Sequence, residues 1–180
     1  MAARDAPVVE PLGHQHDRSG FSCGEPALDE YLRQRASQDI RRRVARVFVA
    51  LGSSESEIAG YYALSAAAFR RDDLPTELAR RLPRYPIPAA VLGRLAVSSN
   101  HQGRGLEEHL LADALHRVMA ASSALAIYAV IVDAKNEAAK AFYLRYGSQP
   151  FPRQPMRLFL PMSTLAGGGL SQDLRIQIKP

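Results

Sequence analysis

The chain has 180 residues, 47% of them hydrophobic, which is enough for one domain around a single buried core. Basic residues outnumber acidic ones by 23 to 18, and the resulting net charge of +5 and pI near 9.7 favour an acidic partner. A single cysteine, Cys23, excludes an internal disulfide, and we expect neither a signal peptide nor a membrane-spanning segment. A soluble, reduced, cytoplasmic protein is therefore predicted.

The first part of the chain predicts a short strand, a long helix and a β-hairpin. The first twenty residues mix proline, glycine, histidine and charge, and Val8-Val9 marks a short strand at a sheet edge. Apolar residues recur at helical spacing from Glu25 to Arg43, which predicts one amphipathic helix with an arginine-rich outer face. Two β-branched and aromatic runs, 44–51 and 58–67, flank a turn rich in serine and are typical of a hairpin.

The second part of the chain alternates strands and helices. Residues 70–88 contain four prolines and predict a loop with one short helix near 77–82. Residues 89–97 predict a central strand, because they are mostly apolar. The elements expected after it are an amphipathic helix from Leu106 to Val118, a buried strand at 125–132, a helix at 136–146 and a last strand at 156–161.

A glycine-containing turn connects the central strand to the helix that begins at Leu106. Its two glycines allow a tight bend that directs backbone N–H groups outward, and the helix behind it adds the positive end of its dipole. A phosphate or pyrophosphate group is the natural ligand of such a turn. The residues of this predicted anion site are Gln102, Gly103, Arg104, Gly105, Leu106 and Glu107.

Tyr143 is the candidate chemical group downstream of this turn. Phe142 and Tyr146 share one face of the predicted helix, and Tyr143 lies about 100° away from Phe142 around the axis. We therefore expect its hydroxyl to leave the core and face a cleft, the alternative being a tyrosine that only packs. No metal site is predicted, because His14 and His16 have no second cluster of ligands with metal-binding spacing.

Several stretches together resemble the GNAT superfamily of acetyl-CoA-dependent N-acetyltransferases. The resemblance rests on LGRLAV at 92–97, QGRGLE at 102–107 and NEAAKAFYLRYG at 136–147. Further stretches are similar to the GNAT-type toxins of bacterial toxin-antitoxin pairs. They are FSCGEPALDEYLRQRASQD at 21–39, the arginine-rich stretch after it, YYALS at 61–65 and PMRLFLPM at 155–162.

The resemblance implies an α/β GNAT fold: a mixed central sheet of about six to seven strands, a splayed strand at the cofactor cleft and flanking helices. The acetyltransferase domain is expected over 1–165, followed by a tail at 166–180 that is either flexible or an added edge strand. The resemblance also implies a role for each site residue. Backbone groups of Leu95, Ala96 and Val97 would meet the pantetheine arm and acetyl carbonyl of acetyl-CoA, the turn would hold its pyrophosphate, Asn136 would contact the pantetheine end, and Tyr143 would protonate the departing thiolate.

The acceptor implied by the resemblance is the α-amine of an aminoacyl-tRNA, whose acetylation blocks translation. An α-amine has a reference pKa of about 7.7 to 8.0, so it needs no strong general base. The sequence contains no obvious general base. Two arginine clusters, within 33–46 and 70–84, are expected to contact phosphates. The predicted tRNA contacts among them are Arg41, Arg42, Arg43, Arg46, Arg70 and Arg71.

Further partners and two alternative functions follow from the same resemblance. The expected protein partners are a cognate ribbon-helix-helix, DNA-binding antitoxin and a second copy of the chain in a homodimer. The first alternative is a GNAT enzyme that acts on a small amine or a protein N-terminus. The second is a catalytically silent module that binds its antitoxin and contributes to repression of its operon.

Glu107 departs from the family pattern, in which glycine or alanine occupies this position because the backbone approaches the cofactor closely. A carboxylate about 5 Å from a phosphate charge costs on the order of 3 kcal/mol at an effective dielectric constant of about 20. Glu107 and Glu108 can instead complement the helix dipole with their side chains in solvent. We predict weakened binding of acetyl-CoA.

Overall fold

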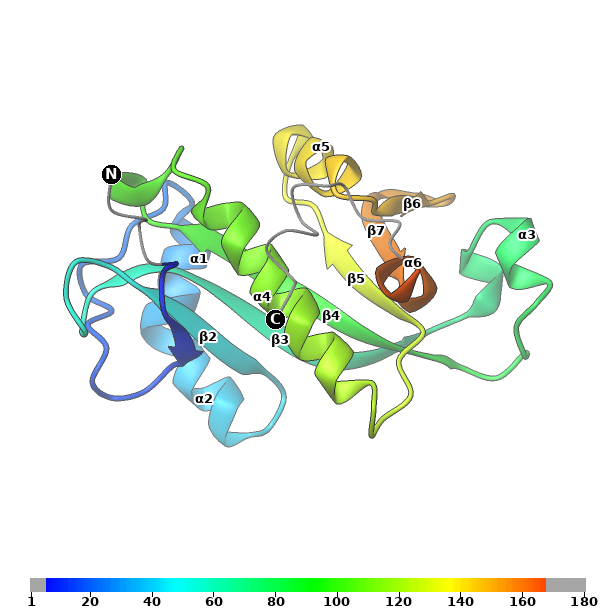
Figure 1. Cartoon of the computed structure of the whole chain (residues 1–180), viewed down its shortest axis with the longest axis horizontal. Coiled ribbons are helices and arrows are strands. Elements are labelled where there is room, and N and C mark those ends of the chain that lie inside the picture. Colours follow the sequence, from blue (N-terminus) through cyan, green and yellow to red (C-terminus); the bar gives the residue numbers. More distant parts are fainter. Residues whose placement is uncertain (1–5, 168–180) are drawn as a thin grey trace. The chain divides into compact units, whose positions relative to one another are not determined.

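The computed structural model describes residues 6–167, and Figure 1 shows the arrangement of its helices and strands. Residues 168–180, which form most of the predicted tail, lie outside the described residues. Seven strands within the described range hydrogen-bond in the order β1-β2-β3-β4-β5-β7-β6. Their bounds are β1 Val9–Pro11, β2 Arg46–Leu51, β3 Ile58–Phe69, β4 Ile87–Val97, β5 Ala129–Asp133, β6 Gln149–Phe151 and β7 Gln154–Pro161.

The helices differ greatly in length, and none between residues 6 and 167 is long and apolar enough to cross a membrane. Two short 3-10 turns, η2 and η3, and one π-helical turn, η1, accompany them. The bounds are α1 Pro26–Glu30, η1 Tyr31–Arg35, α2 Ala36–Arg41, η2 Arg71–Asp73, α3 Thr76–Ala79, η3 Ser99–His101, α4 Leu106–Ala121, α5 Glu137–Arg145 and α6 Met162–Ala166.

The sheet is mixed, as predicted. β4 and β5 run parallel and pair from Ala89–Ala129 to Leu92–Val132, and this ladder ends before β4 itself ends at Val97. The β1–β2, β2–β3, β5–β7 and β6–β7 pairs are antiparallel. β1 is an edge strand, which confirms the expectation for the N-terminal segment.

The chain forms two compact units, and three elements run through both. The first unit comprises the chain up to Leu64 together with Arg94–Asp113, and the second comprises Ser65–Gly93 together with the chain from Ala114 onward. β3, β4 and α4 each begin in one unit and end in the other. The expectation of one acetyltransferase domain over 1–165 stays a prediction.

In the first unit the helical segment 26–41 covers the hairpin formed by β2 and β3. Leu32 and Ala36 are fully buried against a core that includes Val49 and Tyr61. The segment is the single amphipathic helix predicted from the sequence, with one difference in its middle. At η1 the N–H of Ala36 donates to the carbonyl of Tyr31, a π-helical bond that changes which side chains face the core.

In the second unit a cluster of aromatic and aliphatic side chains fills the space around β5 and β7. Phe151 lies 5.7 Å from Phe69 and 5.0 Å from Phe159 between ring centroids. Leu74 and Ile87 join the same core, so the connection from β3 to β4 is anchored at both ends. In Figure 1 this connection carries α3.

The structure corrects three expectations about element bounds. The apolar strand expected at 125–132 begins only at Ala129, and Leu125 is 63% exposed. The short helix expected near 77–82 is α3, Thr76–Ala79. β6 and α6 were not predicted, because each is only three to five residues long and leaves little periodicity to detect.

Candidate active site

The predicted anion site is a backbone turn that glycine makes feasible. Gly103 and Gly105 have φ of +72° and +81°, the left-handed region in which other residues are strained. A side chain on Gly103 would meet no atom within 4 Å, so backbone conformation rather than crowding requires glycine there. α4 begins directly after this turn at Leu106.

The N–H groups of this turn are available to a ligand. Within residues 6–167, no residue accepts a hydrogen bond from the backbone N–H of Gly103, Gly105, Leu106 or Glu107. The first bond of α4 runs from the N–H of His109 to the carbonyl of Gly105, at 3.2 Å. Unpaired N–H groups at the start of a long helix complement an anion, so the residues present fit a pyrophosphate group.

The side chain of Gln102 holds the turn in place. Its amide nitrogen Nε2 donates to the carbonyl of Val97 at 2.9 Å and to the carbonyl of Cys23 at 3.0 Å. Ser99 adds a second link to the N-terminal segment, because its N–H donates to the carbonyl of Ser22 at 2.8 Å. The sequence predicted a backbone role for Gln102 and missed this side-chain role, since a contact across 79 residues leaves no local pattern.

Gly60 lets the start of α4 approach the end of β4. A side-chain carbon on Gly60 would lie 2.9 Å from Leu110 Cδ1 and 3.0 Å from the carbonyl oxygen of Ala96. Ala96 and Val97 are buried, whereas Leu95 is half-buried. The carbonyl of Val97 accepts the hydrogen bond from Gln102.

Glu107 and Arg104 are the charged side chains of the turn. Arg104 is exposed and Glu107 is half-buried in the first turn of α4. The Glu107 carboxylate forms no hydrogen bond or ion pair with any residue that the structure describes. Its charge is therefore not neutralised within that part of the protein.

Asn136 and Tyr143 belong to the second unit, on the segment that forms α5. The side-chain oxygen of Asn136 accepts a hydrogen bond from the N–H of Ala139 at 2.8 Å and so caps the start of this helix. This structural role adds to the pantetheine contact expected for Asn136. The amide nitrogen of the same side chain stays available to a ligand, because the cap uses only the oxygen.

Phe142 and Tyr146 pack against each other, as predicted for one face of the helix, with ring centroids 5.1 Å apart, and Tyr143 is buried as well. Tyr143 is 7% exposed and Tyr146 is 5% exposed, whereas Phe142 is half-buried. Burial raises the pKa of the Tyr143 phenol to about 12. No residue within 6–167 forms a hydrogen bond with its hydroxyl, and the group stays protonated at neutral pH.

The predicted tRNA contacts fall into two groups, in which every arginine is exposed except the half-buried Arg71. Arg41, Arg42, Arg43 and Arg46 surround the end of α2 and the start of β2 in the first unit, and all are exposed. Arg70 and Arg71 lie in the second unit, in the connection between β3 and β4. Sequence reasoning missed Arg153, which lines a pocket together with Arg70 and Arg71.

Comparison with known proteins places these features in a family. Residues 14–147 match the Acetyltransferase (GNAT) family. A Mycobacterium tuberculosis protein named "tRNA-acetylating toxin" is 38% identical over 146 residues, which cover 81% of this chain and 86% of the relative.

Solved structures of toxins have the same fold. AtaT in complex with acetyl-methionyl-tRNAfMet has a TM-score of 0.84 and 31% identity, covering 90% of this chain and 98% of AtaT. A tyrosine-to-phenylalanine mutant of AtaT, bound to the C-terminus of the antitoxin AtaR and to acetyl-CoA, has a TM-score of 0.77 and 28% identity, covering 92% of this chain and 99% of that one. From its sequence match and its fold, this chain belongs to the GNAT acetyltransferase family.

Proposed function

We propose that this chain transfers the acetyl group of acetyl-CoA to the α-amine of an aminoacyl-tRNA, which blocks the use of that tRNA in translation. The observation that supports binding of acetyl-CoA, the acetyl donor, is the row of unengaged N–H groups at the start of α4. The choice of aminoacyl-tRNA as the acceptor is supported by two relatives. They are the tRNA-acetylating toxin at 38% identity and AtaT, which was solved with an acetylated aminoacyl-tRNA.

The chain's own groups supply binding and orientation of the donor. Acetyl-CoA supplies the acetyl group as a thioester. The N–H groups of Gly103, Gly105 and Leu106 would hold its pyrophosphate, and Gln102 fixes the turn that presents them. Backbone groups from Leu95 to Val97 and the amide nitrogen of Asn136 would orient the pantetheine arm.

Tyr143 would supply the proton that the reaction needs. The amine nitrogen forms a bond to the carbonyl carbon, the carbon–sulfur bond breaks, and the thiolate sulfur takes a proton from the phenol. The nitrogen releases one proton to solvent, and solvent returns one to the phenolate, so the step balances. The raised pKa of Tyr143 keeps its hydroxyl protonated until that step. An α-amine is neutral in a useful fraction at pH 7, so the acceptor side requires no strong base.

The arginines of both groups would bind the phosphate backbone of tRNA. Arg41, Arg42, Arg43 and Arg46 form one group, and Arg70 and Arg71 belong to the other. Phosphate contacts of this kind position a nucleic acid without reading its sequence. Binding is therefore expected to weaken steeply as salt concentration rises.

We further infer two protein partners. A cognate antitoxin is proposed because the related AtaT binds the C-terminus of the antitoxin AtaR, and its ribbon-helix-helix type is proposed from the family resemblance. A homodimer is proposed from the family resemblance alone. Light scattering of the chain with and without its antitoxin tests both proposals.

Labelled acetyl-CoA tests the proposed reaction. The wild-type chain is expected to acetylate charged tRNA and to leave uncharged tRNA, free amines and peptide N-termini unlabelled. Label on free amines or peptides, with none on charged tRNA, would establish the first alternative. Binding of the antitoxin without any acetyl transfer would establish a silent module.

Tyr143→Phe tests the proton donor. We expect it to lower kcat by about 10²- to 10⁴-fold with acetyl-CoA affinity nearly unchanged, because only the proton is lost. Tyr146→Phe is the matched control, since it removes a hydroxyl from a second buried tyrosine of the same segment. Equal activity of the two variants would remove Tyr143 from this role.

A further inference from the structure

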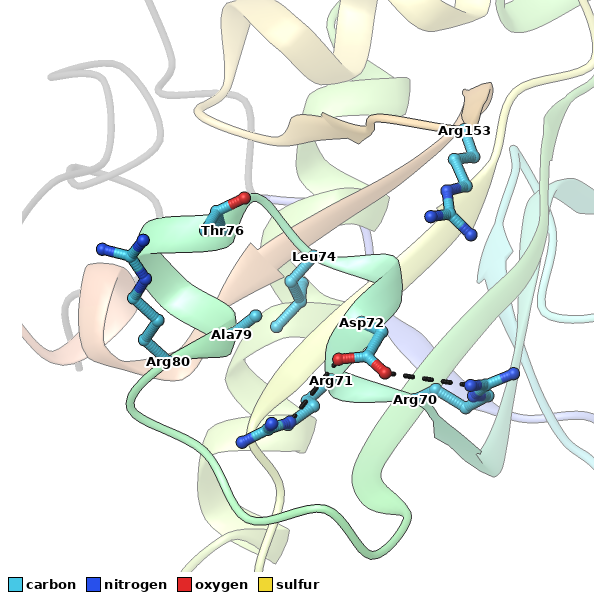
Figure 2. Close-up of a pocket in the computed structure, with 8 residues that line it drawn as sticks. All are labelled: Arg70, Arg71, Asp72, Leu74, Thr76, Ala79, Arg80 and Arg153. Atoms are coloured by element: carbon cyan, nitrogen blue, oxygen red, sulfur yellow. Dashed lines mark ion pairs between the residues drawn. The ribbon is translucent and has the colours of Figure 1, made fainter.

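A pocket of about 460 Å³ in the second unit concentrates positive charge. Four arginines and one acid, Asp72, line it, which gives a formal charge of 4 − 1 = +3. Leu74, Thr76 and Ala79 complete the lining and offer little apolar surface to an organic ligand. Figure 2 shows these side chains, and the arginines are Arg70, Arg71, Arg80 and Arg153.

Two segments that are distant in sequence supply this charge. Arg70, Arg71 and Arg80 come from the connection between β3 and β4, whereas Arg153 comes from the turn between β6 and β7. In Figure 2 Arg153 extends from its turn toward the side of the pocket that Asp72 and Arg70 line. The fold therefore brings a fourth arginine to a cluster that the local sequence already contains.

The backbone beneath these arginines is fixed by specific contacts. Leu74 is 4% exposed and packs in the core of the second unit. Arg71 Nη1 donates to the carbonyl of Leu82 at 2.8 Å, and the carboxylate of Asp73 accepts from the N–H of Arg70 at 3.0 Å. A ligand would therefore meet a platform that is ordered before binding.

The single acid leaves most of the guanidinium donors available. Asp72 lies 3.8 Å from Arg70 Nη2 and 3.5 Å from Arg71 Nε, both longer than hydrogen bonds. Arg80 and Arg153 form no ion pair with any residue between 6 and 167. Each guanidinium carries five N–H donors in a planar fork that matches phosphate oxygens.

We propose that this pocket binds a backbone phosphate of the RNA acceptor, with Arg153 and Arg80 as contacts in addition to Arg70 and Arg71. The proposal rests on the proposed function and adds a defined phosphate position to it. Arginine recognises phosphate with paired hydrogen bonds, and an RNA offers a phosphate at each nucleotide. A free phosphate ion has the same chemistry and is the alternative source.

Arg153→Gln and Arg84→Gln form the central comparison. Both remove one positive charge from an exposed part of the second unit, but Arg84 does not line the pocket and is not among the six arginines predicted to contact tRNA. We expect Arg153→Gln to weaken binding of uncharged tRNA about 5- to 10-fold at about 100 mM salt and to reduce the salt slope by about one. Arg84→Gln should change the affinity less than about twofold, because an exposed charge without a direct phosphate contact is screened by salt.

Asp72→Asn and Arg153→Lys sharpen the test. Asp72→Asn removes the acid that competes with phosphate, so we expect tRNA affinity to rise about 3- to 10-fold. Arg153→Lys keeps the charge but lacks the fork, so it should restore only part of the affinity that Arg153→Gln loses. Circular dichroism melting of each variant checks that the fold is intact.

The outcomes separate this proposal from the proposed function. Equal losses in Arg153→Gln and Arg84→Gln, with wild-type acetylation of charged tRNA intact, would overturn the pocket alone. A wild-type chain that neither binds nor acetylates tRNA would overturn both. Titration with inorganic phosphate tests whether the pocket instead binds a free phosphate ion. If Arg153→Gln abolishes phosphate binding and leaves tRNA binding unchanged, the pocket binds the free ion and the RNA contact is overturned.

Discussion

The carboxylate of Glu107 carries a negative charge in a turn whose backbone N–H groups are otherwise suited to bind an anion. The residue is half-buried, and its carboxylate has no partner among residues 6–167. The unengaged N–H groups of Gly105 and Leu106 lie in the same turn. A bound pyrophosphate and this carboxylate would therefore compete for the same positive end of α4.

Replacing Glu107 should strengthen acetyl-CoA binding. Because the side chain is partly exposed and screened by solvent, we expect about a tenfold gain in Glu107→Gln rather than the full hundredfold of a buried pair. Glu107→Gly also removes the bulk of the side chain, so the difference between the variants measures the steric contribution. Isothermal titration calorimetry with acetyl-CoA measures both.

Equal acetyl-CoA affinities in the wild-type chain and both variants would mean that Glu107 faces solvent. In that case its role is to complement the helix dipole, and Glu107→Gln should lose a few tenths of a kcal/mol of folding free energy. Glu107→Gly should lose about 0.5 to 1 kcal/mol more, because glycine is a poor helix former. The stability measurement therefore has a defined result even when the affinity does not change.

At the scale of elements, the end of the helical segment 26–41 carries an unusual backbone conformation. Arg43 has a φ of 60°, and it alone among the non-glycine residues of the described range has a positive φ. The N–H of Val44 donates to the carbonyl of Asp39 at 3.0 Å, which closes the helix end in a form that glycine normally provides. An arginine in this conformation lowers the stability of the folded chain and holds a positive charge at a fixed position.

Arg43→Gly should therefore move stability and tRNA affinity in opposite directions. We expect the free energy of unfolding to rise by about 1 kcal/mol, because the left-handed conformation no longer strains a side chain. The affinity for tRNA should fall about three- to tenfold, since a phosphate contact is lost. Urea unfolding and filter binding measure the two effects.

Arg43→Ala is the control that separates charge from strain. It should lose the same tRNA affinity without gaining stability, because alanine is strained in the left-handed region as well. A stability gain in Arg43→Ala as large as in Arg43→Gly would show that charge repulsion among the arginines, rather than the backbone, causes the effect.

Long periodic elements could be predicted from the sequence, and short ones could not. The α4 stripe was predicted correctly, and its members from Leu106 to Val118 are buried. Leu125 belongs to an apolar run yet is exposed, because the run is longer than the part of β5 that pairs. The shared face of Phe142 and Tyr146 was predicted correctly, but the near-complete burial of Tyr143 was not, since aromatic neighbours one residue apart give an ambiguous helical pattern.

The candidate site was predictable only where one short segment contains it. The turn at 102–107 is such a segment, because its two glycines and the following helix are contiguous. The Gln102 side-chain bonds and the position of Arg153 in the arginine pocket depend on contacts between distant segments. The folded chain is needed to find these contacts, since composition and spacing do not encode them.

At the scale of the whole molecule, buried tyrosines determine the response to alkaline pH. Burial raises the pKa of Tyr31 to about 12, with a further contribution from its hydrogen bond to Asp39, and raises that of Tyr143 to about 12. The pKa of Tyr61 is also raised by burial. An unfolded chain releases these protons near pH 10, so the folded form holds them more tightly.

The contribution of these tyrosines to the free energy of unfolding should therefore be fully present below about pH 10. It should fall as the pH rises from about 10 through about 12. Tyr143 alone accounts for roughly 2 to 3 kcal/mol of this loss at about 1.4 kcal/mol per pKa unit. Urea unfolding at pH values from 8 to 11.5 measures the slope, which should be shallower in Tyr143→Phe. Parallel slopes for the wild-type chain and the variant would contradict the assignment.

The two hydrogen bonds of Gln102 also have a consequence for the order of folding. One of them is local, to Val97, but the other joins the turn to Cys23, which precedes Gln102 by 79 positions, so the turn is fully fixed only after a large loop has closed. A chain that is still being synthesised has its N-terminal segment long before it has this partner. Competence to bind the acetyl donor is thus acquired late, when most of the first unit has been made and folded.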